Sequence, residues 1–452
     1  MMSAPMASVQ PLCHIPENGK VSPHEARIER YELDDGDRLL RRVLRRDGTV
    51  AETDLGPAPR RTKNPDWLHA IADQRYLRHS TLPNAGSAGD PVIVVDLFSG
   101  LGSLSLGVVE AARALGSRAE IGLAADADPA VLDVLSASLA PPPGTVRCVD
   151  LEAALAGRGE RPTTAERTLL SGCPEAIDVL VAGPPCQGHS RLNNYTRHDD
   201  PRNDLYARVV RFVELRRPRF CIVENVDSVV HDQRHSAAIA ARRLRDLSYR
   251  VDTAPVVLQW LGVPQTRRRH VLVATRADQR SVDVRDVLAT YAVGEPELRT
   301  VRWAIGDLVG KEAQRSIDLP SSPTPVNLKR MRWLHRTPAY DLPNDLRPDC
   351  HRLPRRTEDG EARTHSYASM YGRLRWDQPA QTITSGFGSM GQGRYVHPGE
   401  PRTLTPHEAG RLQLLPDFVE LERAPTRSQW ARMIGNVAPM KLSYVFALEF
   451  LR

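Results

Sequence analysis

From residue 91 onward, short apolar runs alternate with segments of helical periodicity, and this alternation constrains the fold more than any other feature. The apolar runs that we predict to be buried strands are 91–96, 120–125, 178–182 and 220–224. The segments that we predict to be helices are 105–115, 129–139 and 205–216. This pattern is typical of parallel βαβ units, whose sheet carries helices on both faces. The sequence therefore predicts an α/β fold with a doubly wound sheet.

The remainder of the chain has a weaker pattern. Between about 280 and 376, proline and arginine are frequent and no period holds, which indicates a second, irregular domain. In residues 1–90, Asp35-Gly36 and Asp47-Gly48 are turn signals that favour a small pair of hairpins. The predicted organisation is an N-terminal extension of unknown role over 1–90, a main domain over 91–279, the irregular domain over 280–376, and a return to the main domain over 377–452.

Composition narrows the class of protein. With 41% hydrophobic residues and 26% charged residues, the chain can bury an ordinary core. Its net charge of +6 favours a polyanionic partner, although codon usage in a GC-rich genome also explains its arginine bias. The six cysteines form no Cys-x-x-Cys pair, which argues against a disulfide framework and a structural metal. Short apolar runs and the lack of a signal pattern predict a cytoplasmic protein without a membrane span.

A Pro-Pro-Cys turn directly follows the predicted strand 178–182, in the segment Gly183-Pro184-Pro185-Cys186-Gln187-Gly188. Cys186 is a candidate nucleophile, because a stiff turn can hold its sulfur out from the edge of a sheet. A small buried hydrophobe in a proline-rich loop is the alternative interpretation. The neighbouring motifs favour the nucleophile.

A second motif, Asp96-Leu97-Phe98-Ser99-Gly100-Leu101-Gly102, joins the first predicted strand to the first predicted helix. Glycines at that point allow a ligand close to the backbone, although an ordinary turn is the alternative. Asp126 ends the second strand, where an acid can bind ribose hydroxyls, and Asp150 is placed to contact an adenine amino group. Helix capping is the alternative for such aspartates, and it is expected of Asp128 before Pro129. Together these residues indicate a nucleoside-bearing cofactor.

Two further motifs carry charge at the ends of strands. Cys221-Ile-Val-Glu224-Asn225-Val226 places a carboxylate at the rim where ligands of a parallel sheet lie, although a surface acid is the alternative. In Gln265-Thr-Arg267-Arg-Arg269, the first and third arginines alternate and are predicted to share one face of the strand that continues over 270–274. A solvated basic edge is the alternative, and we expect it for Arg268.

In this order, the motifs resemble those of the cytosine-5 DNA methyltransferase family of the prokaryotic type. The loop 98–102 is similar to its cofactor loop, 184–187 to its nucleophile motif, 224–226 to its Glu-Asn-Val motif and 265–269 to its Gln-x-Arg-x-Arg motif. Segment 402–413 is similar to the ninth motif, and Gly435-Asn436-Val437-Ala438-Pro439 to the last. The resemblance covers about 91–452. Ser103 stands where a third glycine is frequent, and Asp126 where glutamate is usual.

The resemblance implies a Rossmann-like S-adenosylmethionine-dependent methyltransferase whose smaller irregular domain recognises the target. It implies that Cys186 attacks carbon 6 of a flipped cytosine, that Glu224 holds a proton at ring nitrogen 3, and that Arg267 and Arg269 orient the base. The implied cofactor-binding residues are Asp96, Phe98, Ser99, Gly100, Gly102, Asp126, Asp150 and Asn436. No metal is implied. The implied partners of this monomer are double-stranded DNA and a restriction endonuclease or phage-defence proteins.

Several alternatives stay open. An RNA-directed enzyme is one, because the same catalytic set occurs in a transfer-RNA branch of the family; the long segment between Ala274 and Trp376 favours DNA. A non-catalytic DNA-binding homologue is another, but such proteins tend to lose the cysteine or the glutamate. The basic stretch 329–336 suits phosphate contacts or a solvated helix equally. The polar segment 187–203 is the predicted closing loop.

Overall fold

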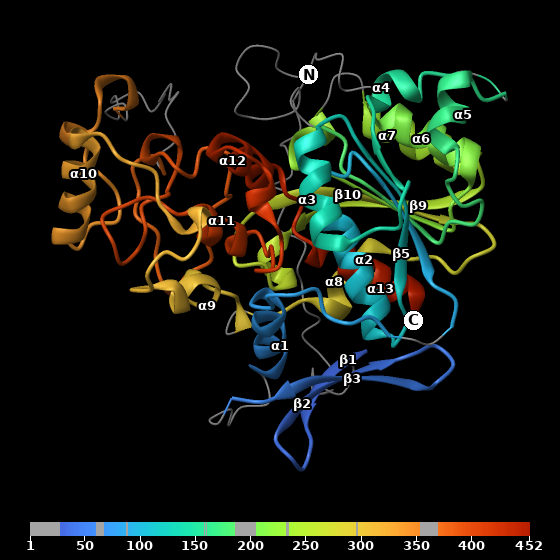
Figure 1. Cartoon of the computed structure of the whole chain (residues 1–452), viewed down its shortest axis with the longest axis horizontal. Coiled ribbons are helices and arrows are strands. Elements are labelled where there is room, and N and C mark those ends of the chain that lie inside the picture. The colour runs from blue at the N-terminus through green and yellow to red at the C-terminus, as the bar shows by residue number, and fades with distance from the viewer. Residues whose placement is uncertain are drawn as a thin grey trace, which may run out of the picture.

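The computed structural model describes residues 28–59, 67–86, 89–157, 159, 161–185, 205–231, 235–294, 297–352 and 369–452 (Figure 1). Cys186 and the predicted closing loop 187–203 lie outside these residues. Within the described part of the chain, no helix combines the length and the apolar character that crossing a membrane requires.

A seven-stranded sheet forms the centre of the main domain, with the strand order β6-β5-β4-β7-β8-β10-β9. Its strands are β4 (Val92–Leu97), β5 (Ala119–Asp126), β6 (Val146–Cys148), β7 (Val179–Ala182), β8 (Phe220–Val226), β9 (Tyr249–Val257) and β10 (Arg268–Arg276). Neighbours from β6 to β8 pair in parallel, which confirms the predicted doubly wound α/β sheet.

Strand β10 is the exception, because it runs antiparallel to both β8 and β9. A parallel crossover needs about a dozen residues or more and usually a helix. The link from β9 to β10 holds only the short 3₁₀ turn Leu258–Leu261, so the chain turns back on itself. The parallel units predicted from the strands up to residue 224 therefore end at β8, and the predicted strand 270–274 lies within the antiparallel β10. The reversal brings the start of β10 to the edge where β4, β7 and β8 end.

Helices cover both faces of the sheet, and they meet alternate side chains of each strand. In β7, Val179 and Val181 belong to one apolar cluster, whereas Leu180 and Ala182 belong to the other. On the first face lie α2 (Ser103–Ala114), α3 (Pro129–Leu139), α8 (Val284–Tyr291) and α13 (Lys441–Leu451). On the second face lie α4 (Leu151–Ala154), α5 (Thr164–Leu170), α6 (Leu205–Arg216) and α7 (Ser236–Asp246). The predicted helix 129–139 is confirmed at both ends, and Asp128 caps it by accepting a bond from the Ala130 amide.

A smaller lobe lies beside the main domain (Figure 1). Its helices are α10 (Pro325–Arg336), α11 (Pro406–Leu412) and α12 (Arg427–Asn436), and α9 (Val301–Ile305) packs against α11. A separate apolar cluster forms part of it and contains Met331, Leu334, Leu342, Tyr371, Met390 and Val396. By contrast, buried residues of α8, α9, α11 and α12 belong to the main cluster.

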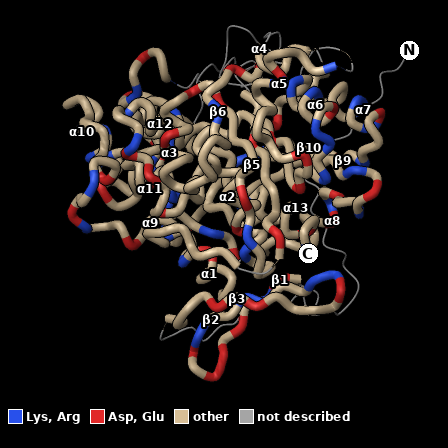
Figure 2. Tube along the Cα trace, turned by 45° about the vertical axis from the view of Figure 1, so that its right-hand side comes forward, with Lys and Arg blue, Asp and Glu red and all other residues tan. Residues whose placement is uncertain are grey.

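The described residues 28–59 and 67–79 of the N-terminal extension form a module, called the N-terminal module below. Strands β1 (Glu29–Leu33), β2 (Arg38–Leu44) and β3 (Val50–Pro57) make an antiparallel sheet, which confirms the predicted pair of hairpins. Helix α1 (Leu68–Leu77) follows them. Figure 2 shows the strands projecting from the main domain, with acidic and basic residues interspersed along them. Helix α1 returns the chain to the main body.

Candidate active site

Three loops of the predicted site meet where β4, β7 and β8 end. In the sheet register, Ala182 lies beside Leu97 on one side and Val223 on the other. Gly183 follows, and a methyl group on its Cα would lie 3.9 Å from Glu224 Oε2 and 3.9 Å from the Phe98 carbonyl oxygen. The cofactor loop, the Pro-Pro-Cys turn and the Glu-Asn-Val motif therefore converge on one point.

The Pro-Pro-Cys turn begins under constraint. The Gly183 amide donates to the Leu97 carbonyl at 3.3 Å, and Asn225 Nδ2 donates to the Pro184 carbonyl at 3.4 Å. Asn225 is buried, and its Oδ1 accepts a bond from the Val226 amide. The turn is thus fastened to both neighbouring strands at Gly183 and Pro184. Cys186 itself lies outside the described residues.

Glu224 and Arg269 form an ion pair at this edge, with 2.5 Å between Glu224 Oε1 and Arg269 Nε. Both side chains are about nine-tenths buried. Burial raises the pKa of Glu224 above its ordinary value, and the charge of Arg269 offsets only part of that rise. The pair therefore provides a carboxyl group that can carry a proton beside a fixed positive charge.

Arg267 has different partners from Arg269. It is buried, and its Nη1 donates to the carbonyl oxygens of Ile383 at 3.1 Å and Gly435 at 3.3 Å. The assigned strand β10 begins at Arg268, so Arg267 directly precedes it. Arg268 is exposed and lies 3.4 Å from Asp227, as expected of a solvated edge. Of the two predicted arginines, the structure brings only Arg269 to Glu224.

Positive φ angles shape the predicted cofactor loop, at Phe98 (56°), Gly100 (53°) and Gly102 (81°). A non-glycine residue seldom adopts such angles, so Phe98 is held by its surroundings. Asp126 anchors the loop, since its carboxylate accepts bonds from the amides of Gly100 at 2.9 Å and Asp128 at 3.0 Å. The aspartate lies beside the loop, and its carboxylate already holds two backbone amides.

Polar atoms beneath this loop lack partners. Asp96 Oδ2 accepts a bond from Ser105 Oγ at 2.7 Å, but Asp96 Oδ1 and Ser99 Oγ, both buried, have no hydrogen-bond partner among the described residues. Burial, with a smaller contribution from Asp126, raises the pKa of Asp96 to about 8. A Cβ atom on Gly100 would meet no atom within 4 Å. Unsatisfied buried polar atoms next to open space fit a polar ligand such as a nucleoside-bearing methyl donor.

Asp150 and Asn436 complete the predicted cofactor set. Asp150 is exposed and caps α4 by accepting a bond from the Glu152 amide at 2.9 Å. Asn436 is the exposed last residue of α12, directly after Gly435. The bond that Arg267 donates to the Gly435 carbonyl therefore links the Gln-x-Arg-x-Arg motif to the last motif of the chain.

A pair of buried glutamines makes a second link that the sequence did not reveal. Gln265 Nε2 donates to Gln413 Oε1 at 2.9 Å, and Gln265 Oε1 accepts a bond from the Ile383 amide at 2.8 Å. Gln413 Nε2 donates in turn to the Ile434 carbonyl at 2.7 Å. Both residues lie within recognised motifs, but nothing in their local pattern shows that they meet 148 residues apart.

A cavity of about 50 Å³ lies elsewhere, between the N-terminal module and the main domain. Its lining includes Tyr31, Arg41, Asp73, Glu110 and Lys441, and none of the predicted site residues. Among the described residues, no group of three or more His, Cys, Asp or Glu side chains could hold a metal ion. The convergence of motifs therefore locates the candidate site at the sheet edge and away from this cavity.

Comparison with known proteins gives a consistent picture. The family model described as C-5 cytosine-specific DNA methylase matches residues 92–451. The Type II methyltransferase M1.BsuMI of Bacillus subtilis (strain 168) is 38% identical over 425 residues, which are 94% of this chain and 95% of that protein. The Type II methylase M.HgiDII of Herpetosiphon aurantiacus is 31% identical over 288 residues, which are 61% of this chain and 76% of that protein.

Solved structures agree on the fold. A putative DNA modification methyltransferase encoded within an Escherichia coli prophage superposes with a TM-score of 0.52 at 21% identity, over 80% of this chain and 99% of that chain. The Dnmt2 methyltransferase of S. pombe superposes with a TM-score of 0.54 at 18% identity, over 79% and 98%. Both likenesses support the mainly parallel α/β sheet described above.

Proposed function

Because the chain belongs to the C-5 cytosine-specific DNA methylase family and is a DNA cytosine-5 methyltransferase, we propose that Glu224 and Arg269 activate the target base for attack by Cys186. The observation that carries this proposal is the buried ion pair of 2.5 Å beside Gly183, with the pKa of Glu224 raised. A carboxyl group that keeps a proton in a cleft can donate it to a ring nitrogen.

The proposed reaction uses three steps on the base. The Cys186 thiolate bonds to carbon 6 of a flipped cytosine while Glu224 holds a proton on ring nitrogen 3. The electron pair that reaches carbon 5 would then attack the methyl group, whose bond to the donor sulfur breaks and leaves its electron pair on that sulfur. Loss of the carbon 5 proton to solvent finally expels the thiolate, and the proton on ring nitrogen 3 returns to Glu224. S-adenosylmethionine, the methyl donor that the family implies, supplies the electrophilic methyl group when bound.

The two arginines receive different proposed roles. Arg269 touches Glu224 and is positioned to fix the base and its proton donor together. Arg267 acts as a positioning residue, because its guanidinium is occupied by the main-chain oxygens of Ile383 and Gly435. Its bonds hold the last motif near the reacting edge.

The proposed donor pocket lies around the loop that follows β4. The unpartnered oxygens of Asp96 and Ser99 would form hydrogen bonds with the methyl donor. Asp126 would accept hydrogen bonds from the ribose of the donor. Gly100 and Gly102 keep the loop free of side chains. Phe98 and Asn436 would cover the ligand, and Asp150 would contact the adenine amino group.

The proposed partner is double-stranded DNA, and the proposed recognition unit is the domain over 280–376. On α10, Lys329, Arg332 and Arg336 are exposed at helical spacing, which suits contacts with phosphates. The relatives named Type II methyltransferases favour a role in restriction-modification, with a restriction endonuclease as functional partner. The enzyme is proposed to act as a monomer in the cytoplasm, where it meets this DNA.

Bisulfite sequencing of DNA from cells that express the chain tests the proposal. Wild type is expected to leave sequence-specific methylcytosine, whereas Cys186→Ser and Glu224→Gln are expected to leave none or very little. Glu175→Gln is the matched control, because Glu175 is an exposed glutamate on the main domain. Methylation that persists in Cys186→Ser would remove that cysteine from its role. Methylation of transfer RNA in place of DNA would overturn the DNA substrate.

A further inference from the structure

The N-terminal module, residues 28–79, lies outside the residues that the family model matches. It is nevertheless fastened to the main domain by buried charges. Arg41 of β2 pairs with Glu110 of α2 at 2.7 Å, and both side chains are more than nine-tenths buried. Arg46 pairs with Glu449 of α13 at 3.0 Å. Breaking a buried pair costs several kcal/mol as a rule, so these contacts keep the module in one place.

Asp73 on α1 is the centre of this interface. Its carboxylate lies 2.8 Å from Lys441 Nζ and 3.0 Å from Arg299 Nη2. Lys441 is the first residue of α13, and Arg299 shortly precedes α9. All three side chains are largely buried, with exposed fractions of 16% for Asp73, 17% for Lys441 and 1% for Arg299. One carboxylate thus joins three elements that are far apart in sequence.

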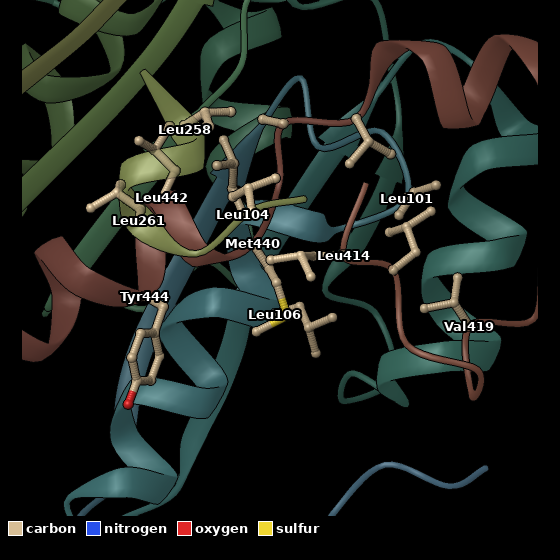
Figure 3. Packing of buried hydrophobic residues seen from close by; sticks show 14 of the residues in the cluster. Leu101, Leu104, Leu106, Leu258, Leu261, Leu414, Val419, Met440, Leu442 and Tyr444 are labelled. Carbon is tan, nitrogen blue, oxygen red and sulfur yellow. The ribbon is translucent and has the colours of Figure 1, made fainter. Parts of the chain in front are cut away.

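Lys441 belongs to the segment that closes the proposed donor pocket. It follows Met440 and the last motif, 435–439, which contains Asn436. Ser443 Oγ donates to the Leu104 carbonyl at 2.7 Å, and Leu104 lies in the first turn of α2, directly after the cofactor loop. Figure 3 shows Met440 between Leu104, Leu106 and Leu414. The start of α13 therefore fixes the position of the closing segment 435–441 relative to the cofactor loop 98–102.

Residues close to Arg299 in sequence connect helix α1 to the segment around Ile383, where Arg267 is bound. Trp303 of α9 donates its ring N–H to the Ala70 carbonyl at 3.1 Å, and Gln74 Nε2 donates to the Trp303 carbonyl at 2.6 Å. The amide of Val301 donates to the Gln378 carbonyl at 2.9 Å. Residue 378 leads into 380–383, where Ile383 accepts the bond from Arg267. Helix α1 therefore supports both segments whose carbonyl oxygens accept bonds from Arg267, the one at Ile383 and the one at Gly435.

We propose that residues 28–79 are a brace for the donor pocket, and that Asp73 is a positioning residue that holds the closing segment 435–441 against the cofactor loop. This inference rests on the proposed donor pocket around Phe98 and Asn436. It gives the extension a role in the methyl-transfer reaction without a contact to the reacting atoms. The effect should therefore appear in affinity for the methyl donor more than in the rate of the chemical step.

The test compares full-length Asp73→Asn with wild type. We expect the Kd for S-adenosylmethionine, measured by calorimetry without DNA, to rise by about 3- to 30-fold, the range typical of residues that couple distant sites. The KM for the donor should rise by a similar factor, while kcat at saturating donor changes by less than about twofold. Asp73→Glu, which keeps the charge, should recover part of the affinity. Asp54→Asn is the matched control, because Asp54 is an exposed ion-pair partner in the same module.

Lys441→Gln is the second variant, in case Asp73→Asn does not fold. It leaves the contact between Asp73 and Arg299 intact and should weaken donor binding in the same direction. Donor Kd values equal to wild type in both folded variants, with only a lower Tm, would show a purely structural interface and overturn the brace. A wild type that binds the donor but methylates no DNA would instead contradict the proposed function, so the two failures are distinguishable.

Discussion

Buried carboxyl groups behave in opposite ways in two regions of this protein. At the edge of the sheet, burial raises the pKa of Asp96 to about 8 and also raises the pKa of Glu224. At the interface of the N-terminal module, burial acts in the same direction on Asp73 and Glu110. There, however, neighbouring cations more than offset it, so the pKa of Asp73 falls to about 2 and that of Glu110 is also lowered.

The number of close cations explains the difference. Among the described residues, Asp96 has no cationic partner and Glu224 has only Arg269, whereas Asp73 faces Lys441 and Arg299. Glu110 likewise faces both Arg41 and Arg113. The two carboxyls with two cations stay ionised and connect separate elements of the fold. Asp96 and Glu224, with one cation or none among the described residues, tend to keep their protons, which suits ligand binding and proton donation.

The largest expected effect concerns the pH dependence of stability through Asp96. Its folded pKa of about 8 lies above the ordinary unfolded value of about 3.9, so its stabilising contribution is complete below about pH 4 and is lost as pH rises toward 8. The loss amounts to up to about 5 kcal/mol in the free energy of unfolding without a ligand. Asp96→Asn should flatten this slope. Urea denaturation of both proteins at several pH values measures it, and equal slopes would contradict the assignment.

The next effect concerns Arg269, the cation that pairs with Glu224. Arg269→Gln removes it, so the pKa of Glu224 should rise further and kcat should fall by about 10²- to 10³-fold. The limb of the pH–rate profile that Glu224 controls should move to higher pH. Arg268→Gln is the matched control, since Arg268 is the exposed neighbour on the same strand. An unchanged profile in Arg269→Gln would separate this arginine from the chemistry.

A smaller effect on the free energy of unfolding, with the opposite dependence on pH, is expected from Asp73 in the N-terminal module. The folded pKa of Asp73, about 2, lies below its unfolded value, so its contribution is present above about pH 4 and is lost as pH falls toward 2. The contribution at neutral pH is about 2 to 3 kcal/mol. Acid unfolding of wild type and Asp73→Asn measures it by the difference in free energy between pH 6 and pH 3. A difference that does not shrink on acidification would refute the ionised state of Asp73.

The smallest effect is expected on the outer face of the same module. Arg38 and Asp54 form an ion pair whose side chains are nearly half exposed. Water and salt screen such a pair, so Asp54→Asn should leave the Tm unchanged within error. A clearly lower Tm of Asp54→Asn would mean that, in this module, solvent exposure does not indicate how much an ion pair contributes to stability.

Local patterns predicted much of the fold and part of the site. Strand β4 is visible in the sequence as a short continuous apolar run, and helix α3 is visible because its apolar residues repeat with a helical period. Strand β9 was missed because only some of its residues are buried, so polar residues interrupt its apolar pattern. The partners of Arg267 and Asp73 were not predictable, since Gly435 lies 168 residues from the first and Lys441 lies 368 residues from the second. Local motifs identify reactive groups, whereas the contacts that hold them arise from the completed fold.

The packing of α13 on α2 has a consequence for the synthesis of the protein. Leu104 emerges from the ribosome 339 residues before Ser443, the residue that bonds to its carbonyl. The apolar face of α2 therefore waits for most of the chain to be translated before its native cover exists. A nascent chain in this state exposes surface that attracts chaperones and other chains. Rapid release of the finished C-terminal helix should thus matter for yield, and strong pauses late in translation should favour aggregation.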